Sequence, residues 1–254
     1  MELEVVLFLV VASGFAGLVD SIAGGGGLIQ LPSLLVALPN TQPSVILGTN
    51  KLPSSLGTAT ATVTYLRRLR PNLRIATMMA VPAFIGSALG ARVATLIPKE
   101  AFRPIILLAL IGVFTYTLVK KDLGLVESKS TNERKNGATA IFFGLVIGFY
   151  DGIFGPGTGT FLMLILVGML GYAFLEATVT TKIVNLSTNI GAILMFGISQ
   201  QIMWTLGLTM AIGNVLGGLI GARLAIRGGS KLIRRVFLFA TALLIARLAI
   251  DTFF

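Results

Sequence analysis

The amino-acid sequence predicts an all-α, polytopic membrane protein made of two inverted repeats, each with about five helical segments and glycine-broken helices near the midplane. Hydrophobic residues make up 55% of the 254 residues and charged residues only 12%, and the mean hydropathy is +0.91. This composition is far from that of a soluble domain. The second half also repeats the first: Asp151 and Lys182 each lie 131 positions after Asp20 and Lys51. Self-similarity at a constant offset, without gaps, indicates a duplicated structure.

Apolar runs and helix breakers define the expected elements. Those of the first repeat lie at about 3–22, 27–38, 44–66, 73–97 and 102–119, and those of the second at about 138–153, 158–170, 174–198, 203–226 and 232–252. The second segment of each repeat is shorter than the ~20 residues that a full span needs. Because each follows a glycine-rich break, it is expected to form a hairpin with the first segment, which either spans or re-enters the membrane.

Between the repeats lies the longest polar run, so the expected organisation is a first transmembrane repeat at 1–120, a cytoplasmic linker at 121–136 and a second transmembrane repeat at 137–254. The first 22 residues begin with Glu2 and Glu4 and lack a basic leading region. The first helix is therefore expected to remain in the mature protein.

The loops indicate how the repeats are oriented. The loop 67–74 carries four arginines, whereas its counterpart 198–205 carries no basic residue. Conversely, 227–235 carries four basic residues and its counterpart 98–103 only two, with Glu100. Cytoplasmic loops are enriched in lysine and arginine, so equivalent loops are expected on opposite sides of the bilayer. This arrangement makes the repeats inverted and places both termini on the periplasmic side.

Composition also excludes several classes of site. The chain has no cysteine and no histidine, which rules out disulfides, thiolate or imidazole metal sites and histidine proton relays. No metal or other cofactor is expected, and no ATP-binding P-loop motif occurs. The net charge of +10 is concentrated in loops, so it reflects membrane topology and not a nucleic-acid partner. The lipid bilayer is the expected partner, and a homodimer stays open.

Two acidic residues precede the glycine-rich breaks. Asp20 lies before Gly24, Gly25 and Gly26, and Asp151 before Gly155, Gly157 and Thr158. Glycine permits close backbone approach, and the N-terminus of a following helix favours an anion. The breaks are therefore candidate parts of a substrate site. Each aspartate has two open readings: it caps the break, or it takes part in proton coupling.

Two lysines interrupt apolar helices at equivalent positions. A lysine at a helix centre costs about 3 kcal/mol on insertion scales, so Lys51 and Lys182 each need a partner or a watery cavity, unless they snorkel to an interface. Two such cations favour an anionic substrate. Neutral polar residues beside them complete the candidate substrate-binding set, namely Thr49, Asn50, Thr180, Thr181, Asn185 and Asn189, with Asn214 as a further cavity residue.

Other polar residues are expected to serve as anchors. Arg92 and Arg223 lie near segment ends, after patterns of small residues, so snorkelling or helix-end capping is expected and both are excluded from the site. The single Trp204 fits an interfacial anchor.

The glycine motifs resemble those of the TauE/SafE family, also called the toluene-sulfonate uptake permease family. They are GLVDSIAGGGG at 17–27, GTNK at 48–51, GSALGAR at 86–92, YDGIFGPGTG at 150–159 and the pair Thr181-Lys182. The resemblance covers essentially the whole chain. It implies a bacterial inner-membrane carrier of small sulfur-containing anions such as sulfite, sulfonates and sulfoacetate, exporting in some members and importing in others.

The residues and the resemblance together predict a secondary transporter of small sulfur-containing anions that works by alternating access, and no enzyme activity. A passive anion channel is one alternative. An intramembrane enzyme built on an Asp20–Asp151 dyad is a more remote one, because a dyad requires the two carboxylates to lie within hydrogen-bond reach. Substrate, direction and coupling ion stay open at this stage.

Overall fold

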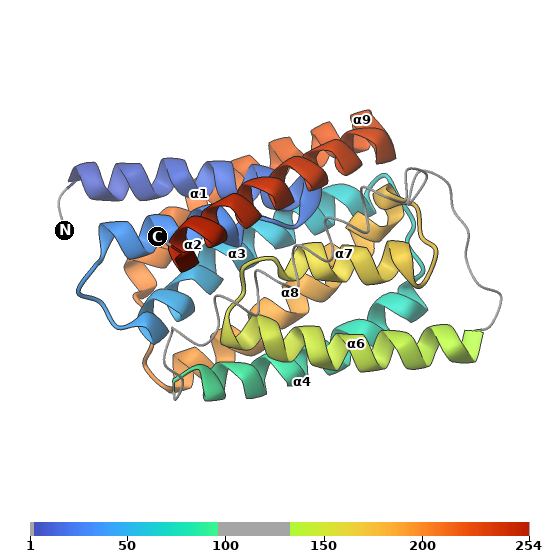
Figure 1. The fold of residues 1–254 in the computed structure, drawn as a ribbon, viewed down its shortest axis with the longest axis horizontal. Coiled ribbons are helices and arrows are strands. Elements are labelled where there is room, and N and C mark those ends of the chain that lie inside the picture. The colour runs from blue at the N-terminus through green and yellow to red at the C-terminus, as the bar shows by residue number, and fades with distance from the viewer. Residues whose placement is uncertain (1–2, 96–132, 254) are drawn as a thin grey trace.

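The computed structural model describes residues 3–95 and 133–253, and all regular secondary structure in these ranges is helical (Figure 1). The helices are α1 (Leu3–Ala23), α2 (Gly27–Ala37), α3 (Pro43–Leu66), α4 (Leu73–Ala94), α6 (Glu133–Ile153), α7 (Thr158–Gly168), α8 (Phe174–Ile198) and α9 (Trp204–Phe253). The predicted all-α fold is confirmed. The expected segment 102–119 lies outside the described residues.

The helix α9 consists of two helical parts. At Gly229 the backbone leaves the helical region, with φ 60° and ψ −165°. The part after this kink folds back along the molecule toward the C-terminus (Figure 1). The break falls between the two segments that the sequence predicts at 203–226 and 232–252.

Five helices in the described ranges are long and apolar enough to cross a membrane: α1, α4, the 136–153 part of α6, α8 and the 204–239 part of α9. The helices α2 and α7 have 11 residues each and fall short of that length, as the sequence predicts. Apolar side chains line the outer face of α9 every four residues, at Leu208, Ile212, Leu216, Ile220 and Leu224. Such exposed apolar stripes are stable against lipid and not in water.

The two halves pack through equivalent contacts. A Cβ atom placed on Gly86 of α4 would meet the Leu145 carbonyl of α6, and one on Gly217 of α9 would meet the Gly14 carbonyl of α1. These four residues are again pairs separated by 131 positions. Glycine is needed in both places because the helix backbones touch. The α1–α9 and α4–α6 interfaces are thus built in the same way.

The direction of the helices is visible in Figure 1. Starting near the N-terminal label, α1 runs along the long axis of the molecule, and its equivalent α6 runs the opposite way. The helix α7 lies between α1 and α6 in Figure 1, and its residues Leu162, Met163 and Leu166 are fully buried. This arrangement brings the two glycine-rich breaks, which follow α1 and α6, to the interior.

Candidate functional site

The two glycine-rich breaks meet each other inside the protein. Gly24 and Gly155, which are equivalent in the two repeats, have φ values of 77° and 87°. Residues with a side chain rarely adopt such values. A Cβ atom on Gly24 would lie 2.5 Å from the backbone carbon of Gly159, and one on Gly27 would lie 3.2 Å from the Cα of Pro156. Glycine therefore allows the first break to pack directly on the second.

Lys51 of α3 forms an ion pair with Asp151 of α6. The Lys51 Nζ lies 2.6 Å from Asp151 Oδ2 and also donates to the Asp151 backbone carbonyl at 2.8 Å. The second carboxylate oxygen, Oδ1, accepts a 2.7 Å hydrogen bond from the Thr158 hydroxyl at the start of α7. Both charged side chains are 3% exposed. This ion pair therefore has short contacts and is shielded from solvent.

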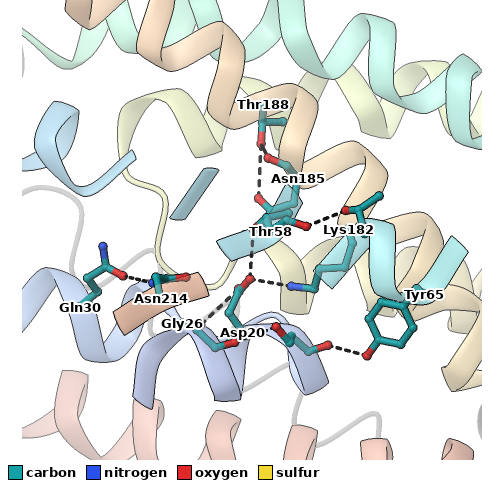
Figure 2. Close-up of polar contacts among 12 residues, drawn as sticks. Asp20, Gly26, Gln30, Thr58, Tyr65, Lys182, Asn185, Thr188 and Asn214 are labelled. Atoms are coloured by element: carbon teal, nitrogen blue, oxygen red, sulfur yellow. Dashed lines mark hydrogen bonds and ion pairs between the residues drawn. The ribbon is translucent and has the colours of Figure 1, made fainter. Parts of the chain in front are cut away.

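Lys182 of α8 forms the equivalent ion pair with Asp20 of α1, shown in Figure 2. The Lys182 Nζ lies 2.7 Å from Asp20 Oδ2, which also accepts from the Thr58 hydroxyl at 3.3 Å. The other oxygen, Oδ1, accepts from the Gly26 N–H at 3.4 Å. A Cβ atom on Gly26 would collide with the Asp20 side chain, so glycine makes room for the carboxylate.

Each ion pair joins one half of the chain to the other. Asp20 and Lys51 belong to the first repeat, and their partners Lys182 and Asp151 belong to the second. Burying a single charge is very costly, whereas a hydrogen-bonded pair leaves no net charge in the interior. The lysines therefore do not snorkel to an interface. They are held at the contact between the two repeats.

Three polar atoms of residues one or two positions before the lysines are buried without a hydrogen-bond partner. They are Asn50 Oδ1, Thr180 Oγ1 and Thr181 Oγ1, and this holds within the described ranges 3–95 and 133–253. Thr181 is the equivalent of Asn50, and each immediately precedes a lysine. Buried polar atoms are nearly always satisfied, so unsatisfied ones at a repeated position call for a partner such as water, an ion or a ligand.

The remaining predicted residues have varied surroundings. The Thr49 hydroxyl accepts from the Met203 N–H at 3.0 Å, just before α9 begins. Asn185 accepts from the Thr188 hydroxyl, and Asn189, which is 3% exposed, is the equivalent of Thr58. Gly25 is buried within the first break, and Gly157 immediately precedes α7 with φ 82°.

A buried polar cluster joins α1, α2 and α9, and the sequence predicts only one of its members, Asn214. The Asn214 Nδ2 donates to Gln30 Oε1 at 2.7 Å and to the Ser13 hydroxyl at 3.2 Å (Figure 2 draws the first bond). The equivalents of Ser13 and Gln30 are Gly144 and Phe161, so comparison of the repeats hides these two residues. Their polar character within apolar helices was the available signal.

The sequence excludes two arginines from the site and leaves an aspartate dyad as a remote alternative. Arg92 and Arg223 are exposed, away from the ion pairs. In the described part of the chain, each of the carboxylates of Asp20 and Asp151 bonds to a lysine, and no hydrogen bond joins one carboxylate to the other. The two aspartates are thus the counter-ions of two different lysines.

Comparison with known proteins places the chain among membrane transporters. Residues 9–248 match the family described as sulfite exporter TauE/SafE. The chain is similar to a probable membrane transporter protein, ORF9, of Sinorhizobium sp, with 38% identity over 99% of this chain and 95% of the relative. It is also similar to the probable membrane transporter protein YfcA of Escherichia coli K12, with 35% identity over 97% and 90%. A probable membrane transporter protein of Haemophilus influenzae is 34% identical over 99% and 96%. No solved structure matches the chain.

Proposed function

The chain belongs to the TauE/SafE family of membrane transporters, and from this premise we propose that it is a secondary transporter of small sulfur-containing anions that works by alternating access. The names of its relatives indicate a membrane transporter and not an enzyme, and its several long apolar helices fit a multi-pass membrane protein. We propose the substrate class, the mechanism, the location in the bacterial inner membrane and the periplasmic position of both termini.

The observation that carries the proposal is the pair of buried lysines, each neutralised by an aspartate of the other repeat. An anion that replaces the carboxylate beside a lysine neutralises the lysine as the carboxylate did. The lysine is therefore not left as an unpaired buried charge, which would be costly. The partnerless hydroxyl of Thr181, adjacent to Lys182 in the sequence, is a further hydrogen-bond donor for oxygen atoms of such an anion. The glycine-rich breaks let the backbone approach the same place.

Alternating access is supported by where the ion pairs lie. Both pairs bridge the two repeats, so a lysine that changes its partner also changes how the repeats are held together. Transporters with internal repeats move one repeat relative to the other around such a site. The opposite directions of α1 and α6, together with the distribution of basic loops, favour inverted repeats with both termini outside.

Proton coupling has a clear physical route in this arrangement. A proton taken up by Asp20 or Asp151 would neutralise that carboxylate and release its lysine to hold an anion. Proton and anion would then be carried as a neutral unit.

Flux of sulfite into liposomes that contain the purified protein tests the proposal. The Lys51→Ala, Lys182→Ala double variant is expected to lose sulfite flux, because both anion-attracting groups are gone. Lys231→Ala removes an exposed lysine and is the matched control, with flux like that of the wild type. Normal flux in the double variant would contradict the proposal.

The same liposomes separate a carrier from a channel. Saturable flux that accelerates when unlabelled anion is present on the far side indicates a carrier, whereas unitary currents indicate a channel.

A further inference from the structure

We propose that the two ion pairs do different work: Lys182–Asp20 opens to hold the transported anion, and Lys51–Asp151 is a clamp that keeps the two repeats together. The inference rests on the proposed anion transport, and it assigns the anion to one of two positions that the repeat makes equivalent in sequence. The differences between the pairs lie in their hydrogen bonds, their burial and their neighbours.

The hydrogen bonds of Asp151 are short, and those of Asp20 are mostly long. Asp151 is held by Lys51 at 2.6 Å and by the Thr158 hydroxyl at 2.7 Å. Beyond the 2.7 Å contact with Lys182, Asp20 has only contacts of 3.3 and 3.4 Å, which lie beyond the usual range of hydrogen-bond lengths. Moving Asp20 away from its lysine therefore breaks fewer strong interactions.

The two lysines also differ in the hydrogen-bond acceptors that would remain if the paired carboxylate turned away. Lys51 donates to the Asp151 backbone carbonyl as well as to its carboxylate, so it keeps an acceptor if the carboxylate turns away. In the described part of the chain, the Lys182 ammonium donates to the Asp20 carboxylate alone. Displacement of Asp20 leaves Lys182 without a partner, and an anion can fill that role.

Burial points in the same direction. Both side chains of the Lys51 pair are 3% exposed, whereas in the other pair Lys182 is 0% exposed and Asp20 is 16% exposed. The uncovered member of the second pair is the carboxylate that would have to move. Its lysine stays buried, where an arriving anion is bound strongly because little solvent screens it.

The neighbours of the two lysines are different too. The Gln30 Nε2 donates to the Asn50 carbonyl, next to Lys51, and Asn214 holds the other end of Gln30. At the corresponding places near Lys182 the repeat has Phe161 and Ala83, which cannot form this network. The helix around Lys51 is thus tied down by polar contacts. Next to Lys182 in the sequence, the buried Thr181 hydroxyl has no partner and is able to donate a hydrogen bond to an anion.

Competition between Asp20 and the anion for Lys182 gives a direct test. Full-length protein in detergent is titrated with sulfite at neutral pH, and the rise in melting temperature gives the apparent affinity. Asp20→Asn removes the competitor and is expected to tighten sulfite binding roughly tenfold, whereas Asp151→Asn tightens it less. Lys182→Gln is expected to lose sulfite binding. Equal tightening by the two aspartate variants, or sulfite binding by Lys182→Gln, would overturn the assignment.

A milder matched pair guards against poor folding of the charge variants. Thr58→Ala and Thr158→Ala each remove one hydroxyl from one carboxylate and leave all charges in place. Thr58→Ala is expected to tighten sulfite binding roughly two- to threefold, because Asp20 loses a contact that holds it. Thr158→Ala is expected to lower the melting temperature more and to tighten binding less. The reverse order would contradict the division of roles.

Chloride and acetate, titrated alongside sulfite, separate the inference from the proposed function. If Asp20→Asn binds chloride or acetate more tightly but not sulfite, the assignment of Lys182 stands and the sulfur-containing substrate is wrong. If the wild type carries sulfite but Asp20→Asn and Asp151→Asn tighten binding equally, transport stands and the assignment is wrong. If Asp20→Asn tightens the binding of none of these anions, the assignment is also wrong.

Discussion

A lysine inside an apolar helix requires a partner, and in this protein each partner comes from the other half of the chain. Lys51 pairs with Asp151 and Lys182 with Asp20. The sequence predicts that these four residues are important because they interrupt apolar segments twice, at the same offset. It does not predict which aspartate meets which lysine, since pairing within a repeat satisfies the same symmetry as pairing between repeats.

A double-mutant cycle tests the pairing. Lys51→Ala and Asp151→Ala are each expected to lower the free energy of unfolding by about 3–5 kcal/mol, because each leaves a buried charge alone. The double variant is expected to lose less than the sum of the two by at least ~1 kcal/mol. Denaturation of the purified protein in detergent measures these values.

The mismatched cycle of Lys51→Ala with Asp20→Ala serves as the control. These two residues form no ion pair with each other, so their effects are expected to lie closer to additive. A larger coupling in the mismatched cycle than in the matched one would show that the pairs are wrongly assigned.

At the scale of helices, the sequence predicts most boundaries, because apolar runs and breakers mark them. The helix α8 has the predicted bounds, and the short α2 and α7 follow their glycine-rich breaks. The start of α6 is different: the chain is already helical at Glu133, five residues before the expected position 138. Hydropathy identifies only the apolar part of a helix, whereas Glu133, Arg134 and Lys135 are good helix formers that extend it.

The glycine-rich breaks are expected to be sensitive to a single methyl group. Gly24→Ala places a Cβ atom against Gly159 and forces a positive φ on alanine, so the melting temperature should fall. Gly229→Ala is the matched control, because Gly229 also has a positive φ but no atom lies within 4 Å of its Cβ position. Backbone strain of about 1–3 kcal/mol acts at such positions, and Gly229, at φ 60° and ψ −165°, lies in a region that is essentially restricted to glycine.

A larger loss for Gly24→Ala than for Gly229→Ala therefore reflects the contact between the breaks and not backbone strain alone. Thermal unfolding in detergent is expected to show a clearly larger loss for Gly24→Ala. An equal loss in both variants would mean that the breaks do not pack on each other as described.

At the scale of the whole molecule, the predicted orientation of the repeats is open to a simple labelling experiment, because the chain has no cysteine. Arg68→Cys and Ser199→Cys place single thiols at equivalent, exposed positions of the α3–α4 and α8–α9 loops. Inverted repeats put these positions on opposite sides of the bilayer. A membrane-impermeant maleimide is expected to label Ser199→Cys in intact cells and Arg68→Cys only after the cells are permeabilised.

Labelling of both variants from the same side would show that the repeats are parallel. The unmodified chain, without any thiol, gives the background of the assay.

The sequence by itself determined the membrane class, the all-helical fold, the duplication and the family, because composition, apolar segments and glycine motifs are local properties of the chain. Only the tertiary structure decided the ion pairs, whose members lie 100 and 162 positions apart, and the differences between them. A constant offset relates the two copies but carries no information about which helix faces which. That choice depends on how the two glycine-rich breaks pack against each other in space.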